Sequence, residues 1–212
     1  MFSTSSSTER MNDMRILRSF APAFSLCFAF ALVLFAGAVQ TPSARAYALN
    51  GKYWPNNYAI RYVKDSMTSK DSTGFDNARA AWNNSSAPVF FCAGCSGNYV
   101  EMYDQNDGND GTDGFSYEYT SSTGCNANGT TVYIITGAGA YLNTYYTNQS
   151  SYTSGGAIQS VAAHELGHVV GLAHVSNEHE LMYPTTDRWF VDGINTPQSD
   201  DINGTKAIYT PC

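Results

Sequence analysis

The sequence predicts an α+β fold for the body of the chain. Runs rich in β-branched and aromatic residues gather in its first half and read as strands. Apolar residues recur at helical spacing once among these runs and once after them, and a further helix start follows near the end of the chain. Strands that are grouped in this way, instead of alternating regularly with helices, are typical of α+β proteins.

Five runs are predicted to be strands, and a polar stretch at 137–156 is predicted to connect the last of them to the next helix. The run 115–119 is short and alternates in polarity, which suits a strand at the edge of a sheet. The five predicted strands are 58–63, 88–91, 98–103, 115–119 and 131–135.

Two of the three predicted helices show apolar periodicity. The first, 73–82, carries Phe75, Ala78, Ala81 and Trp82 at helical spacing. The second, 157–170, has apolar positions at helical period and also carries two of the four histidines of the chain.

The third predicted helix is recognised by how it starts. Thr196 is a suitable N-cap, Pro197 suits the first helical position, and Asp200 and Asp201 place negative charge in the first turn. We expect this helix to run to about Tyr209.

Residues 1–46 are predicted to be a secretory signal peptide, followed by one domain at 47–212. A charged start precedes the apolar run 20–39, and Ala-Arg-Ala at 44–46 is a cleavage site. The run is near the length of a membrane anchor, but the small-residue site directly after it favours cleavage. We therefore expect a secreted, extracellular protein with no stable membrane association, and a monomer.

The domain at 47–212 has 166 residues (212 − 46), enough for one core. It carries 7 Lys and Arg against 16 Asp and Glu, a formal net charge of 7 − 16 = −9. A surface this acidic argues against nucleic-acid binding.

Four cysteines remain in this domain, which in an oxidising compartment suggests two disulfides. Three connectivities are open. We favour Cys92–Cys95 together with Cys125–Cys212, which would tie the C-terminus to the body of the domain. Cys92–Cys95 could otherwise be half of a zinc site or a redox pair, although no second C-x-x-C exists.

The stretch 164–174 matches H-E-x-x-H-x-x-G-x-x-H at every defined position. On a helix, His164 and His168 share a face and can reach one metal ion. Gly171 allows a sharp turn, so that His174 returns as a third ligand. Three protein ligands leave one tetrahedral position open, which is the pattern of a catalytic zinc. Glu165 projects beside the site, where a general base for a metal-activated water is needed.

The alternative for H-E-x-x-H alone is a pair of surface histidines on an ordinary helix. Because three of the four histidines of the chain fall in the longer motif, we favour the zinc site. The fourth, His179, is predicted to be a solvated loop residue.

An acidic Asp-Gly loop at 104–114 has two interpretations. Its clustered carboxylates could chelate Ca²⁺ as a structural ion, although the spacing is not that of an EF-hand. It could equally be a solvated loop without an ion.

Residues beyond the histidines carry a family resemblance. Leu-Met-Tyr-Pro at 181–184 places Met182 eight residues after His174, which resembles the Met-turn of the metzincin clan. The short gap and the ending Ser-Asp-Asp-Ile-Asn-Gly at 199–204 resemble the matrixin family, over about 53–209. The resemblance implies a twisted, mostly parallel five-stranded sheet with an antiparallel edge strand, three helices and zinc in the cleft.

The resemblance also implies roles for single residues. Met182 would underlie the three histidines as an apolar base without binding the metal. Tyr183, Pro184 and Thr186 are candidate substrate-binding residues. The chain departs from the family pattern at Val175 and at Thr186, where animal members carry a tyrosine that walls the S1′ pocket. No cysteine-switch propeptide separates the predicted signal from the domain.

The function implied is that of a secreted zinc metalloendopeptidase acting on proteins or peptides. We expect the substrate to add as an extra strand near 115–119. One alternative is a secreted zinc-binding protein of this fold without proteolytic activity, but that class would be expected to lack Glu165. Another is a zinc amidase, against which the Met-turn weighs.

Overall fold

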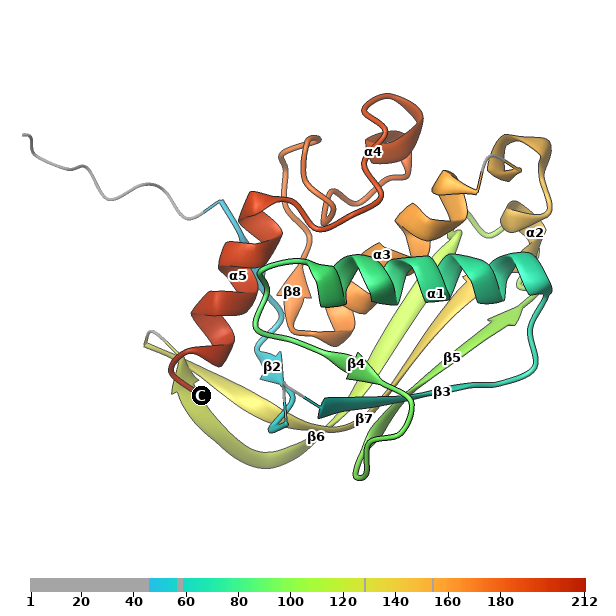
Figure 1. The fold of residues 1–212 in the computed structure, drawn as a ribbon. Coiled ribbons are helices and arrows are strands. Elements are labelled where there is room, and N and C mark those ends of the chain that lie inside the picture. The colour runs from blue at the N-terminus through green and yellow to red at the C-terminus, as the bar shows by residue number, and fades with distance from the viewer. Residues whose placement is uncertain (1–45, 57–58, 128, 154) are drawn as a thin grey trace, which may run out of the picture. The chain divides into compact units, whose positions relative to one another are not determined.

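A mixed β-sheet forms one layer of the molecule, and two long helices, α1 and α3, cover one of its faces (Figure 1). The structure is a computed structural model that describes residues 46–56, 59–127, 129–153 and 155–212. Residues 1–45 of the predicted signal peptide, and the first residue of the predicted strand 58–63, lie outside the described residues. The strands of the sheet are β2 (Lys52–Tyr53), β3 (Ile60–Lys64), β4 (Phe91–Cys92), β5 (Tyr99–Gln105), β6 (Gly114–Ala127) and β7 (Thr130–Asn143).

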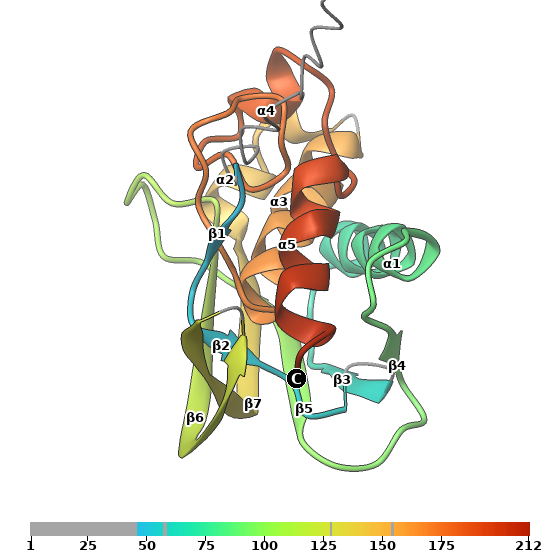
Figure 2. The same ribbon diagram turned by 90° about the vertical axis from the view of Figure 1, so that its left-hand side faces the viewer.

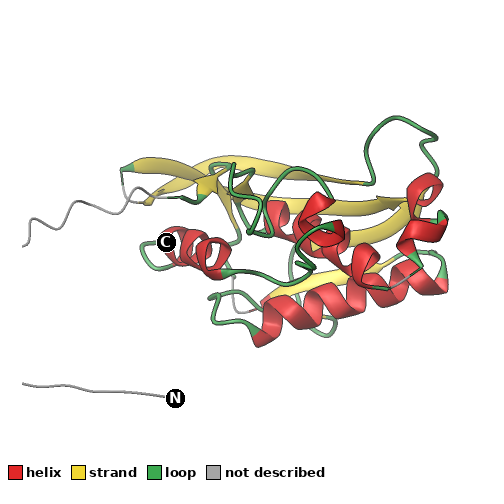
Figure 3. Cartoon of the chain, turned by 90° about the horizontal axis from the view of Figure 1, so that it is seen from above, coloured by secondary structure: helices red, strands yellow, loops and turns green. Residues whose placement is uncertain are grey.

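The helices follow the predicted order, with short turns added between them. They are α1 (Ser69–Asn84), α2 (Thr144–Thr147), the 3₁₀ turn η2 (Ser150–Tyr152), α3 (Gly156–Val169), α4 (Asp187–Phe190) and α5 (Ser199–Tyr209). Seen from above, strands are visible between and beside the helices (Figure 3). None of the helices in the described part of the chain has the length and apolar character needed to span a membrane.

The sheet is parallel apart from one strand, as predicted. Its order is β2-β7-β5-β3-β4, and β6 runs antiparallel along the other side of β7. Strand β6 pairs with β7 alone among the described residues, which confirms the antiparallel edge strand. The predicted number of five strands becomes six because of β2, whose two residues are too few to show a strand pattern.

The β6–β7 hairpin is much longer than the predicted strands 115–119 and 131–135. Strand β7 continues to Asn143, so the stretch 137–156 is a connection only in its second half. Its small residues still face the two sides of the sheet in turn. Ala138 and Ala140 are buried, while a Cβ on Gly139 would lie 2.4 Å from the ring of Tyr117. Because these residues are small and not β-branched, the sequence pattern did not predict a strand here. In the fold they leave room for the ring of Tyr117.

Helix α1 is longer than predicted at both ends but buries the predicted face. Thr68 is its N-cap and accepts a hydrogen bond from the backbone N–H of Asp71. Phe75, Ala78 and Trp82 are fully buried. The indole N–H of Trp82 donates to the carbonyl of Ala163 at 2.9 Å, which fixes α1 against α3.

The final helix begins later than predicted, and Thr196 is not its N-cap. Helix α5 starts at Ser199 with Gln198 as N-cap, in a capping box closed by the carboxylate of Asp201. Asp201 accepts hydrogen bonds from the backbone N–H groups of Leu181 and Met182 as well. These contacts with another segment, which the local sequence does not show, set where the helix begins.

Both predicted disulfides are confirmed. Cys92 bonds Cys95, and Cys125 near the end of β6 bonds Cys212 at the C-terminus. In Figure 2 the C-terminus lies below α5, near the sheet.

Replacing Cys125 and Cys212 with serine is expected to lower the free energy of unfolding by about 2–4 kcal/mol, because this bridge closes a long loop in the unfolded chain. The two residues are 87 positions apart, against 3 for Cys92 and Cys95. Thermal unfolding followed by circular dichroism checks this, with the Cys92→Ser/Cys95→Ser variant as matched control. Equal losses in both variants would contradict the loop-closure explanation.

Candidate active site

The three predicted histidine ligands come together at one point. The Nε2 atoms of His164, His168 and His174 lie 3.1 Å from one another in each pair. A tetrahedral zinc ion with nitrogen ligands at about 2.0–2.1 Å would hold them about 3.3 Å apart. The spacing therefore fits one zinc ion held by all three residues.

The other ring nitrogens of His164 and His168 set the tautomer of these two histidines. His164 Nδ1 lies 2.7 Å from the carbonyl of Leu181, and His168 Nδ1 lies 2.9 Å from that of Leu172. Because a carbonyl can only accept, both Nδ1 atoms carry the hydrogen, and the lone pairs are on Nε2. Carbonyl partners of this kind orient metal-binding histidines and fix their tautomer.

Burial keeps the imidazoles neutral. It lowers the pKa of His168 to about 4, and it lowers the pKa of His164 and of His174 as well. The neutral ring is the form that binds metal, so at neutral pH no proton must leave before zinc enters.

Local structure brings the third histidine back to the helix. His164 and His168 lie one turn apart on α3, and Gly171 then takes a φ of +103°. A Cβ at Gly171 would lie 2.4 Å from the carbonyl oxygen of Lys52, so both the turn and the close approach require glycine. The chain continues through β8 (Leu172–Ala173), which pairs with β1 (Ala48–Leu49), and reaches His174.

Met182, the residue of the predicted Met-turn, packs against helix α3 at Gly167. Met182 is buried, and a Cβ at Gly167 would lie 2.3 Å from its sulfur atom. Helix α3 therefore rests on Met182 between the two histidines of the helix, where only a residue without a side chain fits.

Asp201 fixes this turn from α5 and was not predicted to belong to the site. Its Oδ2 accepts from the N–H of Leu181 at 3.0 Å, and its Oδ1 from that of Met182 at 3.2 Å. The carbonyl of Leu181 is the same group that accepts from His164. Asp201 thus holds the peptide group between Leu181 and Met182, and the carbonyl of this peptide orients the ring of His164.

Replacing Asp201 with asparagine is expected to destabilise the fold by about 1–3 kcal/mol, because an amide offers one acceptor where the carboxylate offers two. It should also weaken zinc binding, since groups that hold a metal-binding histidine in its orientation contribute to the affinity for the metal. Thermal unfolding and zinc affinity measured on the same sample check this. The nearby Asp200→Asn variant is the control, and an equal effect of both substitutions would argue against the role of Asp201.

Glu165 lies next to the first ligand and is only 6% exposed. Burial raises the pKa of its carboxyl to about 8. The hydroxyl of Ser116 on β6 donates a hydrogen bond to this carboxyl, which acts in the opposite direction and lowers the pKa. A Cβ at Gly114 would lie 3.1 Å from the Glu165 side chain, so a glycine on β6 makes room for it. A carboxyl whose pKa lies this near neutrality suits proton transfer.

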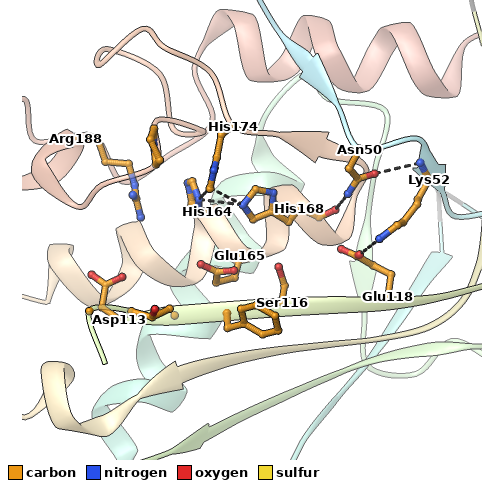
Figure 4. Close-up of a pocket in the computed structure, with 15 residues that line it drawn as sticks. Asn50, Lys52, Asp113, Ser116, Glu118, His164, Glu165, His168, His174 and Arg188 are labelled. Carbon is orange, nitrogen blue, oxygen red and sulfur yellow. Dashed lines mark hydrogen bonds and ion pairs between the residues drawn. The ribbon is translucent and has the colours of Figure 1, made fainter. Parts of the chain in front are cut away.

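A cleft of about 450 Å³ opens over the histidines and Glu165. Its long wall is the outer edge of β6, from Gly114 to Glu118. Figure 4 shows the histidines between two ends of this cleft, with Arg188 and Asp113 at one end and Asn50, Lys52 and Glu118 at the other.

Comparison with known proteins places this geometry in a family. The matrixin family model matches residues 66–210, more than half of the chain. The chain belongs to the matrixin family. The metzincin fold of this family agrees with the mostly parallel sheet and its antiparallel edge strand.

The chain is also similar in sequence to individual proteins. It is 32% identical to matrix metalloproteinase-20 of Homo sapiens over 165 residues, which are 74% of the chain and 32% of that protein. It is 43% identical to metalloendoproteinase 2-MMP of Arabidopsis thaliana over 61 residues, 28% of the chain and 15% of that protein. The chain thus spans about a third or less of the length of these two relatives.

Among solved structures, the matrixin chain is similar to high choriolytic enzyme 1, a hatching enzyme zinc-protease from Oryzias latipes. The TM-score is 0.42 and the identity is 12%, over 76% of this chain and 95% of that one. A likeness this loose adds nothing to the family assignment.

The predicted substrate residues of this matrixin are only partly in the cleft. Pro184 lines it, whereas Tyr183 and Thr186 do not. Tyr183 offers its carbonyl to Arg188, and the hydroxyl of Thr186 donates to Asp113, so both contact residues that do line the cleft.

The cleft also contains residues that the sequence did not single out. Lys52 pairs with Glu118 at 2.6 Å, and the side-chain amide of Asn50 donates to the carbonyl of His168 at 2.8 Å. Asn50 and Lys52 come from a segment far from the histidine motif in sequence, Arg188 follows the predicted Met-turn closely, and no motif marks any of them.

Two other predictions concern the surroundings of the site. His179 is exposed, as predicted, with Nδ1 3.4 Å from Asp192. The acidic loop 104–114 is organised by Asn143, whose amide donates to Gly108, Asp110 and Thr112. Within the described residues, the three histidines form the only group of three or more His, Cys, Asp or Glu side chains close enough to share a metal, so calcium gains no support.

Proposed function

We propose that this matrixin is a secreted endopeptidase in which His164, His168 and His174 hold the zinc and Glu165 is the general base. The observation that carries this proposal is the shared cleft, in which three Nε2 atoms lie 3.1 Å apart beside a buried carboxyl. The two disulfides support secretion, because such bonds persist in oxidising compartments.

The chemistry is divided between the metal and the protein. When bound, zinc supplies Lewis acidity, which makes water a nucleophile near neutral pH and polarises the carbonyl of the scissile bond. Glu165 takes the proton of that water as the carbonyl is attacked, and then delivers it to the leaving amine. The Ser116 hydroxyl orients the Glu165 carboxylate through its hydrogen bond.

Substrate alignment is assigned to the edge of β6. This strand pairs with β7 on one side, and within the described residues no strand pairs with its other side, which faces the cleft. A peptide that adds there as a further strand would gain main-chain hydrogen bonds and lie across the histidines. This orientation brings the scissile bond to Glu165.

The family assignment and the presence of Glu165 both count against a zinc-binding protein without activity. Casein hydrolysis by protein recovered from the medium of a secreting host tests the proposal. We expect cleavage inside the casein chain, its loss with 1,10-phenanthroline, and an N-terminus at Tyr47. Cleavage only at chain ends, or cleavage that the chelator does not affect, would contradict it.

A further inference from the structure

Arg188 is a buried cation that lines the cleft. It lies on α4 and is only 2% exposed. It shares the cleft wall with Pro184 and His164, on the side of the histidines away from Lys52 (Figure 4). A charge in this position must be balanced by partners, because burial of an unpaired guanidinium is costly.

The hydrogen bonds of Arg188 all go to neutral groups. Nε donates to the hydroxyl of Ser160 at 3.1 Å, one terminal nitrogen donates to the carbonyl of Ser160 at 3.3 Å, and the other to that of Tyr183 at 3.1 Å. A guanidinium has five N–H groups. Two of them therefore have no partner within the described part of the chain.

No carboxylate is in contact with this guanidinium. Across the described ranges, no Asp or Glu oxygen lies within 4.0 Å of Arg188, whereas Lys52 at the opposite end of the cleft has Glu118 at 2.6 Å. The nearby Asp113 acts on Arg188 only from a distance, since its Oδ2 is engaged by the hydroxyls of Tyr152 and Thr186. The cation is thus oriented by neutral groups and has no anion in contact with it.

We propose that Arg188 selects an acidic side chain, Asp or Glu, in the substrate position that occupies this end of the cleft. The inference rests on the proposed endopeptidase function and names its substrate class. The planar guanidinium can pair with a carboxylate through parallel N–H···O bonds, which an amide or an aliphatic side chain cannot match. Because Arg188 shares the wall with His164, the acidic residue lies close to the scissile bond.

A purely structural role of Arg188 would have a different effect on the kinetics when the residue is replaced. Its bonds to Ser160 on α3 and to Tyr183 beside the Met-turn make it a clamp between these segments. Loss of a clamp lowers stability and the rate for every substrate alike, whereas loss of an anion partner changes the ratio between substrates.

The experiment compares kcat/KM for amidated peptides that carry Glu or its isostere Gln, placed in turn at the three positions on each side of the scissile bond. Amidation removes the terminal carboxylate, so the side chain is the one carboxylate that varies. We expect Glu to be favoured about tenfold at one position next to the scissile bond, and about equal rates elsewhere.

Variants then assign that preference to Arg188. In Arg188→Gln the Glu to Gln ratio should fall to within about twofold of one, and in Arg188→Lys it should be intermediate, because the charge remains without the fork. Arg79→Gln should keep the full ratio, because Arg79 lies over the ring of Tyr62 on β3 and does not line the cleft. Bound zinc and the unfolding temperature are measured on each sample, and the ratio cancels a general loss of activity.

Two results would overturn the inference: equal cleavage of Glu and Gln peptides at every position by the unmodified protein, or an undiminished preference in Arg188→Gln. Absence of any cleavage by zinc-loaded protein would instead overturn the endopeptidase function on which the inference rests.

Discussion

Replacing Glu165 with glutamine is expected to lower kcat/KM for peptide hydrolysis by about 10²–10⁴-fold, the range that a positioned general base contributes. The amide keeps the shape of the side chain in its pocket beside Gly114 and Ser116 but cannot take a proton from water. Zinc binding should remain intact, because Glu165 is not one of the three converging nitrogen ligands. Peptide kinetics and zinc content measured on one preparation check both statements.

A matched control for this substitution is Glu101→Gln. Glu101 lies on β5 between the buried residues Val100 and Met102, so it points to the face of the sheet away from the core and the cleft. It should keep the activity of the unmodified protein. Equal activity of Glu165→Gln at full zinc content would remove Glu165 from the mechanism.

Replacing His168 with alanine is expected to weaken zinc binding by more than about 100-fold, because even the outer partners of a ligand are worth 10–100-fold. The two remaining nitrogens cannot hold the ion in the same way, and peptidase activity should disappear with it. His179→Ala is the control, since that exposed histidine lies outside the cluster. Zinc retention after dialysis, read by atomic absorption, checks the expectation; zinc retained in His168→Ala would contradict the ligand assignment.

The pH dependence of zinc retention follows from the lowered pKa values. An ordinary histidine has a pKa of 6.5, whereas burial lowers that of His168 to about 4. In the metal-free protein the unfolded chain takes up protons as pH falls below 6.5, but the folded site does so only near 4. The stabilising effect of the neutral ring is therefore present above 6.5 and is lost as pH falls through this window.

Protons should compete with zinc only at the lower end of that window. We expect zinc to stay bound at pH 6 and to be lost as the pH approaches 4, as measured by dialysis against buffers of stepped pH. Loss of half of the zinc already near pH 6.5 would show that the histidines titrate as in a solvated site.

The convergence of the three histidines was predictable from sequence because its geometry is local. His164 and His168 meet through the helical repeat, and Gly171 allows the turn that returns His174. These relations need only a few residues of chain, so a motif can encode them. The burial that raises the pKa of Glu165 is not local, since it depends on the opposing strand β6.

The charged ends of the cleft were not predictable, because they too depend on contacts between segments that are distant in the chain. Arg188, Asp113 and Lys52 come from a helix, a loop and an N-terminal strand that meet only when the sheet is formed. Asp201 could be read as a helix-capping acid, but its bonds to Leu181 and Met182 depend on how α5 packs. The start of α5 was misplaced because this packing, and not Thr196 and Pro197, determines it.

The central claim is that zinc held by the three histidines makes this cleft a peptidase. The most direct test is a zinc titration of metal-stripped protein, with bound zinc and peptide hydrolysis followed together. We predict that activity rises in proportion to bound zinc, levels off at one ion per chain, and is not restored by magnesium. Full activity in stripped protein, or zinc bound without any gain in hydrolysis, would contradict the claim.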